Sequence, residues 1–274
     1  MPRRSRQRHL AKLAARRQAE RRRRRRNRLI AAGLALALIL GGGGAVAAVL
    51  LSGSPTPKAL PSATPTPSAT TTPSVTVACG GTTPPAASAV ARFNGRYSKP
   101  PRMTVEASKR YLWTLQTSCG SIQIALDPKG APKTVNSIVF LTRQGLYDGV
   151  TFHRIVPNFV IQGGDPLGSG TGGPGYTTVD TPPANAQYPV GTIAMAKAQT
   201  EPAGTAGSQF FIVTSSSAQT SLAPNGTAQY AIVGKVVKGL AVVSTIAAVP
   251  VGGQTGDVPQ QNVYIVKATI TVAK

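Results

Sequence analysis

Residues 152–164, FHRIVPNFVIQGG, decide the fold and the function that we expect of this chain. Apolar residues alternate along the stretch as they do in a half-buried β-strand. The run carries one permanently charged side chain, Arg154, and Phe159, Val160 and Gln162 follow it closely. Arg154 is therefore the first candidate functional residue of the chain.

Three further segments carry related patterns, and they are 191–196 (GTIAMA), 207–213 (GSQFFIV) and 230–236 (YAIVGKV). Together with residues 152–164 they resemble the signature segments of the cyclophilin family of peptidyl-prolyl cis/trans isomerases. The resemblance covers about residues 107–274. It implies a mainly β fold, a closed eight-stranded antiparallel barrel capped by two helices.

The spacing of apolar residues predicts many short strands punctuated by Gly and Pro, which is typical of a barrel or a sandwich. Periodicity alone does not separate these two architectures, and the resemblance favours the barrel. Helices are predicted from Pro132, where Val135, Ile138 and Val139 share one face, and over 239–249. The predicted strands are 111–117, 121–126, 152–156, 159–162, 192–196, 209–214, 230–237 and 262–272.

Rotation about an X–Pro bond faces a barrier of about 18–20 kcal/mol because the amide is resonance-stabilised. Lowering it needs no nucleophile, metal or cofactor, and we expect none. Catalysis needs a pocket that binds the proline ring and a hydrogen-bond donor that binds the twisted amide more strongly than the planar one. Arginine suits the donor role, since it stays charged and presents a fixed fork of N–H groups.

The resemblance assigns roles to individual residues. It implies that Arg154 is catalytic and that Gln162 and Gln209 orient it and contact the substrate backbone. The remaining substrate-binding residues are those of the proline pocket (Phe159, Val160, Phe211, Leu222 and Tyr230), an edge segment that pairs with the substrate main chain (Ala196, Lys197 and Ala198) and a glycine-rich loop (Gly170).

Two residues depart from the family pattern. Ser221 stands where the pocket rim usually carries a large aromatic residue, and Tyr230 stands where a histidine is usual. The loop between Leu222 and Tyr230 is also longer than the common form. These changes put cyclosporin affinity in doubt more than isomerase activity. They leave open a rival function, a proline-binding or chaperone module with little or no turnover.

Two other polar residues near the signature are interpreted as structural. His153 is one of only two histidines. It points away from Phe152 and Arg154 in the strand alternation, which favours a structural role over a catalytic one. Asp165 follows two glycines, and we expect it to be a turn or hydrogen-bonding residue.

The net charge of +22 is concentrated at the N-terminus, where residues 1–28 hold fourteen of the thirty Lys and Arg and one acid. The next 23 residues, 29–51, carry no charge and are long enough to cross a bilayer as a helix. A basic cluster beside such a span predicts a cytoplasmic tail and an extracytoplasmic C-terminal domain. The basic tail could also contact anionic lipid headgroups. We favour this uncleaved, single-pass anchor over a cleaved signal peptide and over a nucleic-acid-binding tail.

Residues 52–88 are expected to be a disordered linker between the membrane and an isomerase domain at 89–274, because 18 of the 26 residues from 52 to 77 are Pro, Ser or Thr. Cys79 and Cys119 are the only cysteines. Both follow the predicted membrane span, so we expect them to form a disulfide in an oxidising compartment. Two free buried thiols are the alternative. The domain would then assist the folding of secreted or cell-envelope proteins, with proline-containing polypeptides as its partners.

Overall fold

The computed structural model describes residues 76–273. The predicted basic tail (1–28), the apolar span (29–51) and residues 52–75 of the predicted linker lie outside the described residues. Between residues 76 and 273, no helix combines the length and the apolar character that crossing a membrane requires.

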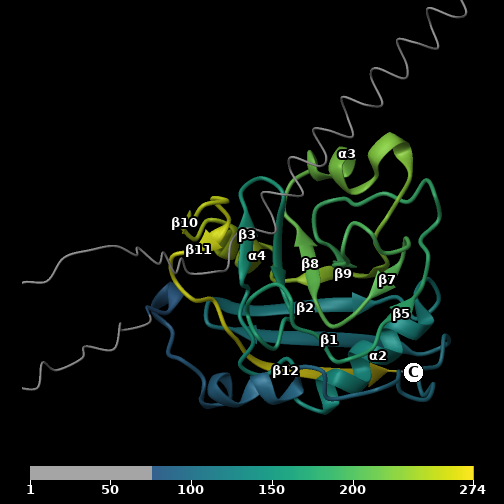
Figure 1. Cartoon of the computed structure of the whole chain (residues 1–274), viewed down its shortest axis with the longest axis horizontal. Helices are drawn as coiled ribbons and strands as arrows, with labels where there is room; N and C mark the ends of the chain where they lie inside the picture. The colour runs from purple at the N-terminus through teal and green to yellow at the C-terminus, as the bar shows by residue number, and fades with distance from the viewer. Residues whose placement is uncertain (1–75, 274) are drawn as a thin grey trace, which may run out of the picture. The chain divides into compact units, whose positions relative to one another are not determined.

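The core of the described part is one eight-stranded antiparallel sheet that curls strongly (Figure 1). The strands follow the order β12-β1-β2-β9-β6-β8-β4-β3. Each predicted strand is present, and the ends differ from the predicted ones by a few residues. Their bounds are β1 Arg110–Thr117, β2 Gly120–Leu126, β3 Arg154–Val156, β4 Val160–Gly163, β6 Thr192–Met195, β8 Phe210–Val213, β9 Ile232–Lys238 and β12 Ile265–Ala273.

The expected closed barrel is not what the structure shows, because β3 and β12 remain the two edges of the sheet. The segment before β3 meets the start of β12 over a short stretch, through an isolated bridge between Thr151 and Tyr264 and backbone hydrogen bonds that flank it. The sheet is therefore a curled half-barrel. The physical reason is the shortness of β3, whose three residues pair with β4 and leave no continuous ladder toward β12.

Alternation along the strands explains which face of the sheet is filled. In β1, Tyr111, Trp113 and Leu115 are buried, whereas the residues between them are more exposed. Trp113 lies edge-on to Phe210 of β8, with 5.0 Å between the ring centroids. The apolar faces of the curled strands thus meet in one core.

Helices cover this core from two sides, as predicted. Helix α2 (Pro132–Arg143) packs against β12 and β5, and α4 (Leu240–Ala247) packs against β2 and β4. The remaining short elements lie in the connections. They are β5 (Thr178–Val179), β7 (Thr205–Ala206), β10 (Val251–Gly252), β11 (Val258–Pro259), α3 (Ala218–Leu222) and the 3₁₀ helices η1 (Ala78–Gly80), η2 (Pro85–Phe93) and η3 (Pro224–Gly226).

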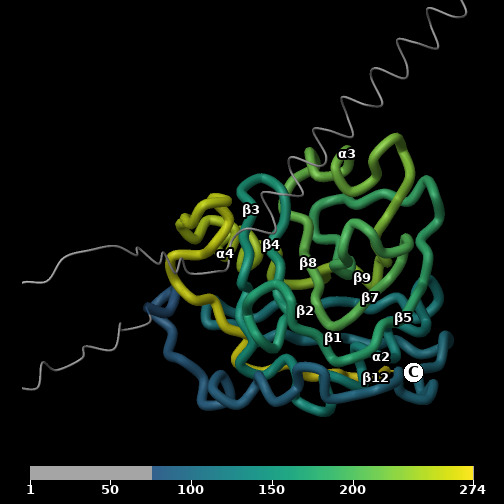
Figure 2. The backbone as a smooth tube through the Cα atoms, viewed as in Figure 1, coloured from purple at the N-terminus to yellow at the C-terminus, as the bar shows by residue number. Residues whose placement is uncertain are grey.

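The segment before β1 is attached to the sheet domain, and it runs along the lower edge of the molecule in Figure 2. The predicted disulfide between Cys79 and Cys119 is present and anchors its start. Further along, Val90 and Phe93 of η2 are buried in the core. Gly149 contacts the η2 backbone so closely that a Cβ there would lie 2.5 Å from the Ala87 nitrogen. The folded part therefore extends upstream of residue 89, where the domain boundary was predicted.

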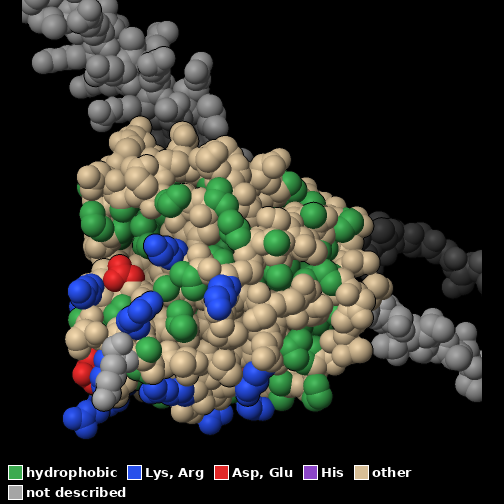
Figure 3. Space-filling model, turned by 180° about the vertical axis from the view of Figure 1, so that it is seen from behind, with side chains coloured by type: hydrophobic (Ala, Val, Ile, Leu, Met, Phe, Trp, Pro, Cys, Tyr) green, Lys and Arg blue, Asp and Glu red, His purple; other side chains and the backbone are tan. Residues whose placement is uncertain are grey.

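Basic side chains remain in excess on this domain. Residues 76–273 hold fourteen Lys and Arg against seven Asp and Glu. On the face drawn in Figure 3, Lys and Arg outnumber the acidic side chains, and they gather toward one lower corner.

Candidate active site

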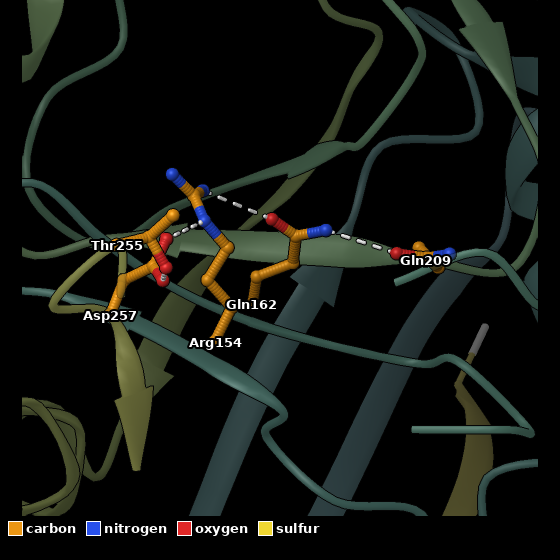
Figure 4. Close-up of polar contacts among 5 residues, drawn as sticks. All are labelled: Arg154, Gln162, Gln209, Thr255 and Asp257. Atoms are coloured by element: carbon orange, nitrogen blue, oxygen red, sulfur yellow. Dashed lines mark hydrogen bonds and ion pairs between the residues drawn. The ribbon is translucent and has the colours of Figure 1, made fainter. Parts of the chain in front are cut away.

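Arg154 begins β3, and the antiparallel register places it directly opposite Gln162 of β4. The Nη1 group of Arg154 donates to Oε1 of Gln162 at 3.3 Å (Figure 4). The Nε2 group of Gln162 then donates to Oε1 of Gln209 at 3.0 Å. The structure thus joins three residues that the sequence singled out into one polar chain.

The chain continues into the glycine-rich loop. Nε2 of Gln209 donates to the carbonyl oxygens of Gly170 and Gly172, at 3.0 and 2.9 Å. Asp165 holds the loop from inside, since its buried carboxylate accepts hydrogen bonds from the backbone N–H groups of Leu167, Ser169 and Gly170. The structural role expected for Asp165 is confirmed. The loop therefore fixes Gln209, and Gln209 fixes Gln162.

A carboxylate that the sequence did not point to completes this network. Nε of Arg154 donates to Oδ2 of Asp257 at 2.7 Å, and the hydroxyl of Thr255 donates to the other oxygen of the same carboxylate (Figure 4). Burial raises the pKa of Asp257, but the hydrogen bonds from Thr255 and Arg154 lower it by more, so this pKa lies below its ordinary value. Asp257 therefore carries its charge beside Arg154 at neutral pH.

The predicted proline-pocket residues form a second apolar cluster, distinct from the main core. Val160, Phe211 and Leu222 are buried in it, and Phe159 and Tyr230 pack against it. The rings of Phe211 and Tyr230 meet edge-to-face with 5.3 Å between their centroids. Phe210, the preceding residue of β8, points instead into the main core. The paired phenylalanines thus serve opposite faces, as the alternation predicts.

The expected edge segment, residues 196–198, lines a hollow of about 660 Å³. Gln162, Gln209, Gly170 and residues 196–198 all contribute to its lining. The ammonium of Lys197 donates to the carbonyl oxygen of Ala198 and lies 5.6 Å from the Tyr230 ring centroid. The Ala198 N–H is occupied by the carboxylate of Glu201 at 2.6 Å. A substrate that pairs with Ala198 through this N–H must displace Glu201.

One wall of the hollow comes from the N-terminal segment, and sequence reasoning did not find it. Asn94 and Gly95 line the hollow. Gly95 N–H donates to the carbonyl of Gly173 at 2.9 Å, and Gly173 N–H donates to the Asn94 side chain at 3.1 Å. No periodic pattern marks 94–95, so only the fold brings this pair to the glycine-rich loop.

Burial shifts the titration of two rings near Arg154. Desolvation raises the pKa of Tyr230, and the nearby charge of Arg154 opposes part of that rise. Desolvation also lowers the pKa of His153, whose two ring nitrogens have no hydrogen-bond partner among the described residues. Both rings are therefore neutral at pH 7. Within residues 76–273, no group of three or more His, Cys, Asp or Glu side chains is arranged to hold a metal ion.

Comparison with known proteins gives a consistent result. The family model described as cyclophilin type peptidyl-prolyl cis-trans isomerase/CLD matches residues 112–270. The chain is 41% identical over 171 residues to peptidyl-prolyl cis-trans isomerase B of Streptomyces anulatus, a match that covers 56% of this chain and 91% of that protein. It is 38% identical to peptidyl-prolyl cis-trans isomerase-like 1 of Bos taurus over 160 residues, which covers 56% and 89%.

A solved structure agrees with the sequence comparisons. A cyclophilin type peptidyl-prolyl cis-trans isomerase of Cryptosporidium parvum, crystallised in the presence of the dipeptide Ala-Pro, has a TM-score of 0.51 and 30% identity. The match covers 58% of this chain and 98% of that one.

Proposed function

Because this chain belongs to the cyclophilin family and is a peptidyl-prolyl cis-trans isomerase of that type, we propose that Arg154 drives its reaction by twisting X–Pro amides without covalent chemistry. As the bond twists, the prolyl nitrogen recovers its lone pair and becomes a better acceptor. A guanidinium N–H that donates to this nitrogen binds the twisted amide more strongly than the planar one. Such differential binding lowers the barrier.

The observation that carries this proposal is how the guanidinium is held. Nε is engaged by Asp257 and Nη1 by Gln162, whereas Nη2 has no hydrogen-bond partner among residues 76–273. Two fixed points define the plane of the group, and the third nitrogen remains available to a substrate.

The neighbouring surfaces suit the rest of an X–Pro segment. The second apolar cluster, with Phe159, Val160, Phe211, Leu222 and Tyr230, would hold the proline ring. Gln162, Gln209, Gly170 and residues 196–198 would contact the peptide backbone along the hollow. Proline-containing polypeptides are the substrates that this arrangement fits.

Exchange NMR on an Ala-Pro-containing peptide tests the proposal, because it measures turnover and affinity together. With the full chain, Arg154→Ala should lower kcat/KM by about 100-fold, which corresponds to about 2.7 kcal/mol of transition-state stabilisation. Arg154→Lys keeps the positive charge but loses the forked N–H groups. Its kcat/KM should lie between those of the wild type and Arg154→Ala. Unchanged turnover in Arg154→Ala would remove Arg154 from the mechanism. Peptide binding without turnover in the wild type would establish the rival binding module.

We also propose that the domain works outside the cytoplasm, on secreted or cell-envelope proteins. The support is the basic segment 1–28, the uncharged stretch 29–51 and the disulfide, which persists in oxidising compartments. Protease added to intact cells stripped of their outer envelope layers should release an active domain. Digestion only after lysis would place the isomerase in the cytoplasm. Anionic lipid headgroups are proposed as a contact of residues 1–28, and no nucleic acid partner is proposed.

A further inference from the structure

We infer that Asp257 is a positioning residue for the isomerase reaction, because it aligns the guanidinium of Arg154 for donation to the substrate. This inference rests on the function proposed for Arg154. It deepens that function by assigning a role to Asp257, which lies 103 residues from Arg154 in the chain and belongs to a different hairpin.

The β10–β11 hairpin delivers the carboxylate to the edge of the sheet. Asp257 comes immediately before β11, and its carbonyl accepts a hydrogen bond from the N–H of Ile155 in β3 at 2.9 Å. The hairpin is thereby attached to the strand that carries Arg154. Gly256, with a φ of +68°, permits the turn that brings the Thr255 hydroxyl to the carboxylate of Asp257. Backbone contacts of the hairpin therefore hold Asp257 next to the strand that carries Arg154.

Two carboxylate oxygens have distinct tasks. Oδ2 accepts from Nε of Arg154, and Oδ1 accepts from the Thr255 hydroxyl. Thr255 therefore prevents the carboxylate from rotating away. The side chain of Asp257 is 17% exposed and that of Arg154 is 39% exposed. The Asp257 carboxylate is thus mostly shielded from solvent, whereas the Arg154 guanidinium remains accessible.

The carboxylate has two opposing effects on Arg154. It fixes the direction of the free N–H, and it offsets part of the positive charge. The effect on the direction of the free N–H should be the larger one. The charge of a partly exposed guanidinium is screened by water, whereas a hydrogen bond to the substrate is lost when its donor points elsewhere. Removing Asp257 should therefore lower the turnover. If charge dominated, removing it would raise the turnover.

The chain supplies a matched control. Asp148 pairs with Lys267 at 2.7 Å, the same distance as Asp257 to Arg154, and its side chain is 14% exposed. Asp148→Ala therefore removes an ion pair of similar geometry and burial outside the Arg154 network. It reports the cost of losing such a pair without losing the alignment of Arg154.

The experiment compares full-length wild type, Asp257→Ala, Asp257→Asn, Asp148→Ala and Arg154→Ala by exchange NMR with one X–Pro peptide. We expect Asp257→Ala to lower kcat at least tenfold with KM changed less than twofold. Asp257→Asn, which keeps an acceptor oxygen, should lose less, and Asp148→Ala should keep wild-type kinetics. The Nε–Hε resonance of Arg154 should shift in Asp257→Ala and stay in place in Asp148→Ala.

The inference is overturned if kcat of Asp257→Ala stays within twofold of wild type, rises, or falls no further than in Asp148→Ala. Should Asp257→Ala not fold, Thr255→Val decides, because it keeps the carboxylate and removes only its second donor. We expect at least a threefold fall in kcat there, and an unchanged kcat contradicts the inference. Full activity in Arg154→Ala would instead refute the proposed mechanism, whereas an inactive Arg154→Ala beside a fully active Asp257→Ala would refute only the role of Asp257.

Discussion

The side-chain amides of Gln162 and Gln209 form a direct hydrogen bond of 3.0 Å, which links the arginine side of the site to the glycine-rich loop. Each amide is engaged at both ends, because Gln162 also accepts from Arg154 and Gln209 also donates to two loop carbonyls. The orientation of one amide therefore sets that of the other.

This relationship predicts that Gln209→Ala weakens catalysis without touching Arg154. The variant removes the hydrogen bond that the Gln162 amide donates and leaves that amide held by Arg154 alone, and the loss of one such hydrogen bond is worth about 0.5–1.5 kcal/mol. We expect a fall in kcat/KM of about 2- to 12-fold in exchange NMR. Gln187→Ala is the control, since within residues 76–273 that side chain donates only to the nearby Asn185 carbonyl. Equal kinetics for the two variants would show that the linkage does not act on the site.

Cyclosporin should bind weakly if Ser221 occupies the rim position where the family pattern usually has a large aromatic residue. Ser221 is exposed on α3 beside Leu222, which is buried in the second apolar cluster. Ser221→Trp should therefore tighten cyclosporin inhibition more than it changes turnover. Ser244→Trp, at an exposed position on α4, is the control and should leave inhibition unchanged. Tight inhibition of the wild type would show that Ser221 does not occupy the rim position.

The disulfide between Cys79 and Cys119 should contribute measurably to stability. It spans 40 residues, and in the chain-entropy model such a loop constrains the unfolded state by up to about 4 kcal/mol. The double variant Cys79→Ser/Cys119→Ser should melt several degrees lower by calorimetry. Treatment with a reductant should lower the melting temperature of the wild type and leave that of the variant unchanged. A reductant-insensitive wild type would contradict the prediction.

Acidification should destabilise the domain through His153. Burial lowers the folded-state pKa of His153 below the ordinary 6.5, so the unfolded chain takes up a proton first. Stability from this residue is complete above about pH 6.5 and is lost as the pH falls from there through the folded-state pKa.

Denaturant unfolding between pH 8 and 4.5 measures this effect. His153→Leu is the comparison, since neither ring nitrogen has a hydrogen-bond partner within residues 76–273. As the pH falls, the free energy of unfolding of the wild type should decrease more than that of His153→Leu. Parallel pH curves would show that His153 does not titrate differently in the two states.

Local pattern was sufficient to predict the strands, and the resemblance to the cyclophilin family supplied the site residues. Alternation in 152–164 marked two strands, and the structure shows that their register places Gln162 opposite Arg154. Phe210 and Phe211 also followed from alternation, because successive residues of a strand face opposite sides. Strand alternation needs only neighbours in the sequence, whereas the roles of the site residues came from the family resemblance.

Contacts between residues far apart in the sequence could not be predicted from local patterns. Asp257 lies in a Gly-rich hairpin with no periodicity, and only the packing of that hairpin on β3 brings it to Arg154. Asn94 reaches the glycine-rich loop because η2 is packed into the core. The open sheet was missed for a similar reason, since strand length at β3 decides whether the ladder continues.

The pairing of β1 with β12 makes completion of the sheet depend on the synthesis of β12. β1 starts the sheet at Arg110, yet its partner on one side is the last strand of the described chain, with Arg110 opposite Ala273. Until the ribosome has released that strand, β1 exposes an unpaired edge that can join other chains. The nascent domain therefore needs shielding until β12 has been synthesised, because its sheet is incomplete before then. A truncation before residue 265 should yield an aggregating product rather than a weakened enzyme.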